Sequence, residues 1–187
     1  MAMTTLSNGL GEAGRYDEEL GILEARLAFL RRFGCSLNYI DVTKANMAVC
    51  YSNLRRHEEA LTLRRELYAR ALAFRGPSDE FFAMALNLAL SLMHTRRLEE
   101  AKSFLREQLP AARRALGNDH RLVLKLRGVY AETSVHDQSS TRDNIDEAVS
   151  IMEVIQRSQR VFGAAHPEAQ HKRRILKALE TQRSSRA

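Results

Sequence analysis

The chain of 187 residues carries a formal net charge of +6, and 44% of its residues are hydrophobic but only 6% are aromatic. The apolar content is enough for a core, whereas the scarcity of aromatic, glycine and proline residues argues against a strand-rich fold with frequent turns. The longest uncharged run, residues 81–95, is shorter and more polar than a membrane-spanning helix, and the N-terminal residues form no recognisable secretory signal.

The cysteine content favours one kind of compartment. There are two cysteines, Cys35 and Cys50, with no CxxC pair and no Asn-x-Ser/Thr acceptor for a glycan. These features favour a reducing, intracellular setting, and we expect a cytoplasmic protein. The positive net charge permits an acidic partner without specifying one.

The N-terminal part predicts one complete helix preceded by a short segment. This helix begins near Tyr16 and ends before Gly34, a residue that readily adopts the positive φ found just past helix ends. Its apolar stripe, at helical spacing, consists of Leu20, Leu23, Leu27 and Leu30. Residues 1–13 leave room for one short helix, so the chain starts either with a truncated first repeat or inside a longer array.

A repeat organises the rest of the chain. The sequence of residues 46–60, NMAVCYSNLRRHEEA, recurs 41 residues later as NLALSLMHTRRLEEA. Over residues 46–76, eleven of thirty-one positions are identical at this spacing, where chance would give about two or three. The duplication predicts helix pairs at 39–54 with 57–75 and at 79–95 with 98–116, and Pro110 should kink the last of these without ending it.

The C-terminal part keeps the plan with changes. A third pair is predicted at 121–135 and 144–162, with a polar, lengthened loop at residues 136–141, and a last helix at 168–181 should cap the array. A glycine closes each predicted unit, at Gly34, Gly76, Gly117 and Gly163. The predicted divisions are a partial repeat at 1–34, repeats at 35–76, 77–117 and 118–163, and a capping helix with a basic tail at 164–187.

These units resemble the tetratricopeptide repeat (TPR). The resemblance rests on a small residue in the first helix, an acidic pair and alanine opening the second, and Gly-x-x-His-Pro between units. The period of 41 to 42 residues, longer than the usual ~34, and the Asn-x-Ala phrase resemble the kinesin-light-chain subclass. The residues that carry the resemblance are Asn46-Met47-Ala48, Asn87-Leu88-Ala89, Ala60, Ala101 and Gly163-Ala164-Ala165-His166-Pro167. The third unit has Gly128-Val129-Tyr130-Ala131 instead of the Asn phrase.

The resemblance implies an all-α, right-handed superhelix (α-solenoid) of antiparallel helix hairpins, whose first helices line a concave groove for a partner's peptide. Helical spacing divides each first helix into a packed face, which includes Ala48 and Ala89, and an opposite face. The candidate groove residues are Asn46, Val49, Asn53, Asn87, Leu90, His94, Lys125 and Glu132, with Ala83, Leu86 and His136 as further candidates. The repeated asparagine either hydrogen-bonds a peptide main chain or bonds to a neighbouring helix or loop.

The remaining patterns identify no catalytic or cofactor site. The histidines lack metal-ligand spacing, no glycine-rich phosphate loop follows a strand, and no carboxylate pair is isolated among apolar residues. We therefore expect a non-catalytic adaptor without a cofactor, which binds a protein or peptide partner and no membrane. The basic residues of the tail at 171–186 leave a nucleic-acid-binding helical repeat as one alternative. The partial first repeat leaves a fragment of a longer TPR array as another.

Overall fold

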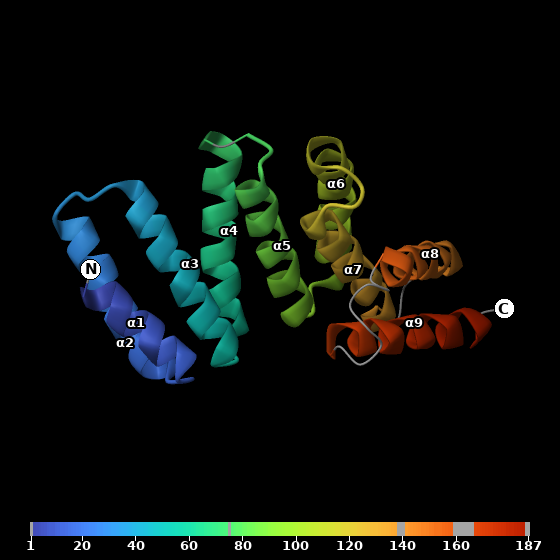
Figure 1. Ribbon diagram of the computed structural model, residues 1–187, viewed down its shortest axis with the longest axis horizontal. Coiled ribbons are helices and arrows are strands. Elements are labelled where there is room, and N and C mark those ends of the chain that lie inside the picture. The colour runs from blue at the N-terminus through green and yellow to red at the C-terminus, as the bar shows by residue number, and fades with distance from the viewer. Residues whose placement is uncertain (1, 75, 138–140, 159–166, 186–187) are drawn as a thin grey trace. The chain divides into compact units, whose positions relative to one another are not determined.

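The computed structural model describes residues 2–74, 76–137, 141–158 and 167–185, and these are organised as nine α-helices without a strand (Figure 1). The prediction of an all-α fold is confirmed. The chain divides into two compact units, unit 1 at Met1–Gly76 and unit 2 at Pro77–Ala187, which are described separately.

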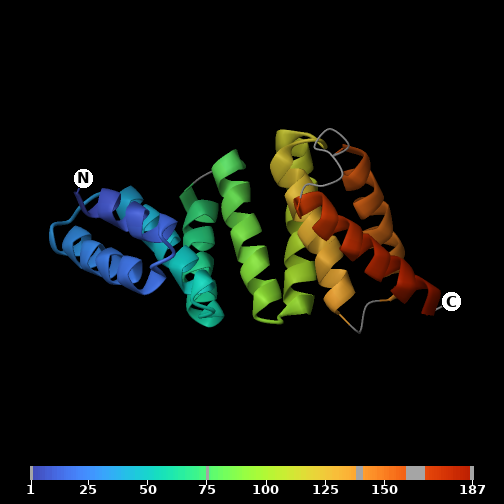
Figure 2. The ribbon, with the colours of Figure 1, turned by 60° about the horizontal axis from the view of Figure 1, so that its bottom comes forward.

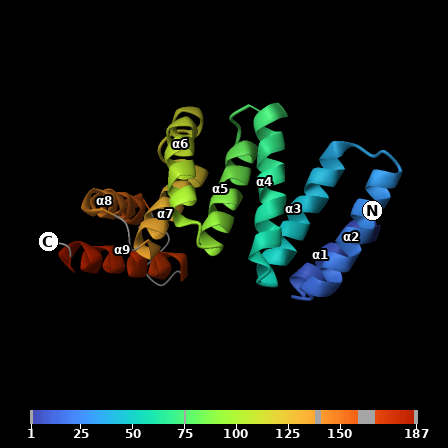
Figure 3. The same cartoon turned by 180° about the vertical axis from the view of Figure 1, so that it is seen from behind.

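Unit 1 consists of two helix hairpins. Its helices are α1 (Ala2–Glu12), α2 (Tyr16–Arg32), α3 (Leu37–Asn53) and α4 (His57–Phe74). Each helix packs against the next one, and α3 and α4 run side by side in opposite directions (Figure 3). The core between α2 and α3 contains the predicted leucine stripe together with residues of helix α3, in the set Leu20, Leu23, Leu27, Leu30, Ile40, Met47 and Cys50.

Unit 2 contains five helices within its described residues. They are α5 (Asp79–His94), α6 (Leu98–Leu116), α7 (Arg121–His136), α8 (Arg142–Ser158) and α9 (Pro167–Ser185). Successive helices pack on one another, and α7 also packs on α5 and α9 (Figure 2). Helix α7 thus occupies the middle of unit 2, and its Leu126 and Tyr130 side chains are fully buried.

The predicted helices agree with the observed ones to within a few residues. Helix α6 has the predicted bounds and continues through Pro110. The last helix buries Ile175 and Leu179. The predicted ends at residues 75 and 162 and the Gly-x-x-His motif at 163–166 lie outside the described residues. The segment left open at the N-terminus is a helix, α1, that packs on α2.

The turns within the hairpins share one geometry that the sequence did not predict. Positive φ angles occur at Gly14 (72°), Arg55 (62°) and Arg96 (61°), which are spaced by 41 residues. The following N–H group in each turn donates to a carbonyl five residues back, from Arg15 to Leu10 (2.9 Å), Arg56 to Tyr51 (2.8 Å) and Arg97 to Leu92 (2.9 Å). This is the Schellman cap, which normally uses glycine. The predicted positive φ is confirmed at Gly34 and Gly117.

Candidate functional site on the first helices

Helix α3 has a packed face and an exposed face, as its spacing predicted. Met47 and Ala48 are buried on the packed face. Val42, Asn46, Val49 and Asn53 recur at spacings of 4, 3 and 4 on the other side, which we call the α3 face. Val42 is 46% exposed and Val49 51% exposed, while Asn46 is half-buried and Asn53 exposed. Two apolar side chains therefore alternate with two amides.

Ion pairs with α4 fix the orientation of this helix. The ammonium group of Lys44, which is nearly buried, pairs with the carboxylate of Glu66. One turn earlier, the carboxylate of Asp41 lies 3.2 Å from the guanidinium of Arg70. Both pairs lie between α3 and α4, so they help to hold the α3 face on the outside of the hairpin. On that face the Nδ2 of Asn53 donates to the carbonyl of Val49 at 3.2 Å, a bond within its own helix.

The corresponding residues of α5 lie in unit 2 and differ in exposure. Asn87 and His94 are exposed, and Leu90 and Ala83 are half-buried. Leu86, a further candidate, belongs to the core, because only 8% of it is exposed. That expectation is wrong for a physical reason: α5 packs on both α6 and α7, so it buries more than one narrow stripe.

Helix α7 offers a different surface. Lys125 and His136 are exposed and Glu132 is half-buried. Alignment of the C-terminal ends of α5 and α7 places Val129 where α5 has Asn87, and Val129 is only 7% exposed. The third unit thus lacks the amide at this position and replaces it with a core residue.

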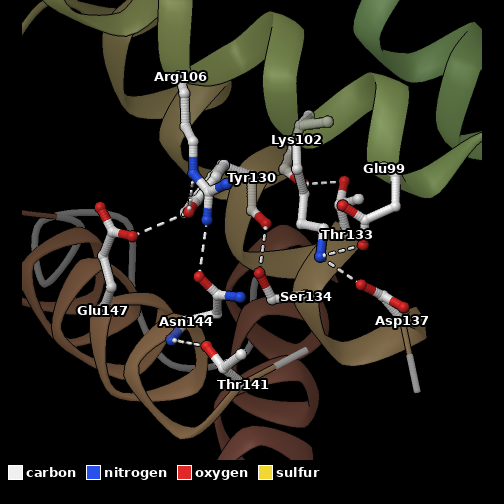
Figure 4. Close-up of polar contacts among 11 residues, drawn as sticks. Glu99, Lys102, Arg106, Tyr130, Thr133, Ser134, Asp137, Thr141, Asn144 and Glu147 are labelled. Atoms are coloured by element: carbon white, nitrogen blue, oxygen red, sulfur yellow. Dashed lines mark hydrogen bonds and ion pairs between the residues drawn. The ribbon is translucent and has the colours of Figure 1, made fainter. Parts of the chain in front are cut away.

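A polar network that the sequence did not predict joins α6, α7 and α8 (Figure 4). The Nε of Arg106 donates to the hydroxyl of Tyr130 at 3.1 Å, and that hydroxyl donates to Glu147 at 2.8 Å. A second guanidinium nitrogen of Arg106 donates to the side-chain oxygen of Asn144 at 2.6 Å. The pKa of Tyr130 is raised, mainly by burial and secondarily by the hydrogen bond to Glu147. Tyr130 is fully buried, so its hydroxyl serves to hold the three helices together.

A buried ion pair joins α6 to the C-terminal end of α7. The ammonium group of Lys102, with its side chain only 2% exposed, pairs with Asp137 and lies 2.8 Å from Glu99. Burial alone would lower the pKa of Lys102, but the hydrogen bonds to Asp137 and Glu99 raise it overall. Asp137, predicted as part of a polar loop, is instead buried against α6.

The two cysteines occupy a loop position and a buried helix position. Cys35 lies between α2 and α3, and Cys50 is fully buried in α3. Burial and the neighbouring carboxylate of Glu19 raise the pKa of the Cys50 thiol to about 12. Glu19 itself accepts a hydrogen bond from the hydroxyl of Ser7 at 3.2 Å. A thiol in this environment is a packing group and a poor nucleophile.

The basic C-terminal helix takes part in packing. The Nε of Arg183 lies 2.6 Å from the carboxylate of Asp146 on α8, so one cation of the tail is engaged within unit 2. In the part of the chain that the structure describes, no three His, Cys, Asp or Glu side chains come together as metal ligands. No described helix is long and apolar enough to cross a membrane.

Comparisons with known proteins agree with this architecture. A family model described as tetratricopeptide repeat matches residues 83–122, which include most of α5 and all of α6. A search of curated proteins gives no match. Two crystal structures of a putative kinesin light chain of Podosopora anserina, with nearly identical TPR-like repeats, superpose with TM-scores of 0.76 and 0.73 at 19% identity, over 99% of this chain and 88% of theirs.

A solved structure from another organism has a similar fold. The structure of BtubC (BKLC) from P. vanneervenii gives a TM-score of 0.75 at 14% identity, over 98% of this chain and 72% of that one. At these identities the likeness concerns the fold, an α-solenoid of helix hairpins. Together with the sequence match in α5 and α6, it supports a fold similar to that of kinesin-light-chain-like tetratricopeptide-repeat proteins.

Proposed function

We propose that the chain is a non-catalytic protein-interaction module, in which the exposed faces of the first helices bind a peptide or surface of a partner protein. Tetratricopeptide repeats generally mediate contacts between proteins. The observation that carries the proposal is the α3 face, where exposed Val42 and Val49 flank the amide of Asn46 on a helix whose other side is packed.

The chemistry of the α3 face suits a peptide with apolar side chains. Covering the exposed half of Val42 or Val49 contributes about 1 kcal/mol each, from the apolar area removed from water. An asparagine amide has both donors and an acceptor, so Asn46 can bond both polar groups of a peptide unit. The α3 face itself carries no charged residue, so its selectivity rests on shape and main-chain hydrogen bonds.

In unit 2 the same role falls to α5 and α7. Asn87 and His94 of α5 are exposed, and α5 packs directly beside α7, which exposes Lys125. These polar groups, with Leu90 and Glu132, favour a partner segment with mixed polar and charged groups. A cytoplasmic location and a protein partner, in preference to nucleic acid, complete the proposal.

The test compares proteins captured from native cell extract by the wild type and by folded variants. Asn46→Ala/Asn87→Ala and Val49→Asp should each lower the recovery of a genuine partner at least about tenfold, because they remove central contacts. The matched control is Leu6→Asp on α1, which places the same charge at an exposed apolar position outside these faces. Recovery of the same proteins in equal amounts with all the variants, at unchanged circular dichroism, would refute the assignment of these faces.

A further inference from the structure

One end of unit 1 exposes a group of large apolar side chains. Every member is at least 50% exposed, and Phe74 reaches 82%. The group, which we call the apolar edge, consists of Phe29 and Phe33 at the end of α2, Leu37 and Tyr39 at the start of α3, and Leu72 and Phe74 at the end of α4.

Local geometry places these helix ends at the same level. The loop at residues 33–36 joins the end of α2 to the start of α3. The ion pairs of Lys44 with Glu66 and of Asp41 with Arg70 set the antiparallel register of α3 and α4. Continued toward the end of the hairpin, this register brings residue 74 level with residue 37 and residue 72 level with residue 39. Figure 1 shows the three helix ends on the upper side of unit 1.

The edge has the composition of a protein interface. Phe, Tyr and Arg are enriched in interfaces, whereas Lys, Glu and Asp are depleted. The charged neighbours of the edge on α2 are Arg31 and Arg32, and the guanidinium of Arg32 lies 5.9 Å from the ring centre of Phe33. The first turn of α3 contains no acidic residue, and Asp41 in the next turn is engaged with Arg70.

The fold does not require this apolar edge. In unit 2 the first two residues of the corresponding helix, α5, are Asp79 and Glu80, and the positions 41 residues after Leu72 and Phe74 are Arg113 and Ala115. Among the described residues of unit 2, no large hydrophobic side chain is exposed to the same degree. The edge is therefore a particular property of unit 1.

We propose that the apolar edge is the interface of a homodimer, in which a second copy of the chain packs its own apolar edge against it. Six side chains with roughly 100 Å² exposed apiece give about 600 Å² per copy, the upper end for an apolar patch on a monomer. With a rim of neighbouring atoms this approaches the ~800 Å² per partner of a standard interface. In a two-fold dimer the same patch serves both copies.

The charges at the edge are compatible with this partner. A guanidinium stacks on aromatic faces and tolerates an interface better than an ammonium does, so Arg31 and Arg32 can lie over the aromatic rings of the other copy. An anionic membrane surface, the competing occupant, is favoured by dense cationic clusters, each cation adding about 1 kcal/mol. The apolar edge has six exposed apolar side chains and two described arginines beside it. Apolar contact with a second copy should therefore contribute more to binding than attraction of the arginines to an anionic surface.

The experiment is sedimentation equilibrium of the full chain between about 1 and 100 µM, where a standard interface with Kd in the micromolar range changes state. The wild type should reach twice the chain mass of 21.3 kDa. The variant Leu37→Asp/Leu72→Arg introduces the residue types found at the corresponding positions of unit 2. Asp at the start of α3 and Arg near the end of α4 both interact favourably with the helix dipoles, so the variant should fold. It should weaken dimerisation at least about 100-fold. Val49→Asp, on the α3 face, is the matched control and should leave the dimer intact.

Three results would overturn the proposal. The first is a wild type that remains monomeric throughout the concentration range. The second is a dimer that persists in the edge variant or dissociates with Val49→Asp. The third is a monomeric wild type that co-sediments with phosphatidylserine vesicles but not with phosphatidylcholine vesicles, which would assign the edge to an anionic membrane. The proposal is independent of partner binding on the α3 face, because the two variants separate the two properties.

Discussion

Two arginines in the left-handed backbone region provide the sharpest test of how this chain is built. Arg55 and Arg96 have φ angles of 62° and 61° at the caps of α3 and α5, where the first hairpin has Gly14. A side chain at such a position brings Cβ close to the carbonyl oxygen. We predict that Arg55→Gly and Arg96→Gly each stabilise the protein.

The magnitude follows from two opposing effects. The left-handed conformation costs roughly 1–2 kcal/mol for a residue with a Cβ. Glycine removes this strain but loses more chain entropy on folding, by about 0.5–1 kcal/mol. Both arginine side chains are exposed, so their removal forfeits little packing. The expected net gain is about 0.5–1 kcal/mol per site, and about 1–2 kcal/mol for the double variant, because distant sites add.

The assay is urea unfolding followed by far-ultraviolet circular dichroism. The matched control is Arg56→Gly, one residue away, which has no positive φ. Its guanidinium lies 2.8 Å from Glu59 and 4.6 Å from the ring centre of Tyr51. The control variant loses both contacts and relieves no strain, so its free energy of unfolding should fall. Arg55→Ala keeps the Cβ atom and should change little.

The result that would refute this reasoning is specific. If Arg55→Gly lowers the free energy of unfolding as Arg56→Gly does, relief of backbone strain does not outweigh the entropy cost of glycine at this turn. If Arg55→Ala stabilises as much as Arg55→Gly, the gain comes from removing the long side chain. Because the two turns lie in different units, a separate unfolding transition for each unit would show which cap responds.

Two further predictions concern buried groups. Lys102→Met should destabilise the protein by about 3 kcal/mol at neutral pH in urea unfolding, because buried Asp137 loses the ammonium group with which it pairs. The pKa of Lys102 is raised in the folded state. The ion pair therefore contributes fully to stability below the unfolded pKa of about 10.4, and this contribution is lost as the pH rises through the folded pKa. In strongly alkaline solution the wild type should then be no more stable than the variant. Cys50, with a pKa of about 12, should resist a thiol reagent at about pH 8, where roughly one molecule in 10⁴ is thiolate, while half-exposed Cys35 reacts. Equal rates for both thiols in the native protein would contradict this.

The helices could be predicted because their signals are local. Apolar residues at helical spacing, glycine at positive φ and the 41-residue duplication each mark a segment without reference to its neighbours. The two sides of α3 follow from the same spacing, which separates buried Ala48 from exposed Val49. The burial of Leu86 on α5 was harder to predict, because α5 packs on two helices, α6 and α7.

The features that escaped prediction depend on tertiary context. Arginine rarely adopts a positive φ, so the residue types at Arg55 and Arg96 do not predict the helix caps found there. Asp137 follows α7 in a run of polar residues, and only its contact with Lys102 reveals it as part of the core. Apolar residues at the ends of helices read as core residues, and spacing alone does not distinguish a buried phenylalanine from the exposed Phe74.

The number of neighbours of each first helix bears on where partner binding resides. Helix α7 packs on α5, α6, α8 and α9, and it buries Val129 at the position of the repeated asparagine. Helix α3 packs on α2 and α4 and keeps Val49 half exposed beside Asn46. A helix packed on four others loses exposed surface to the core, whereas a helix with two neighbours keeps more of it for recognition. On this reasoning Asn46 and Val49 in unit 1, and Asn87 in unit 2, should contribute more to partner affinity than Lys125 or Glu132.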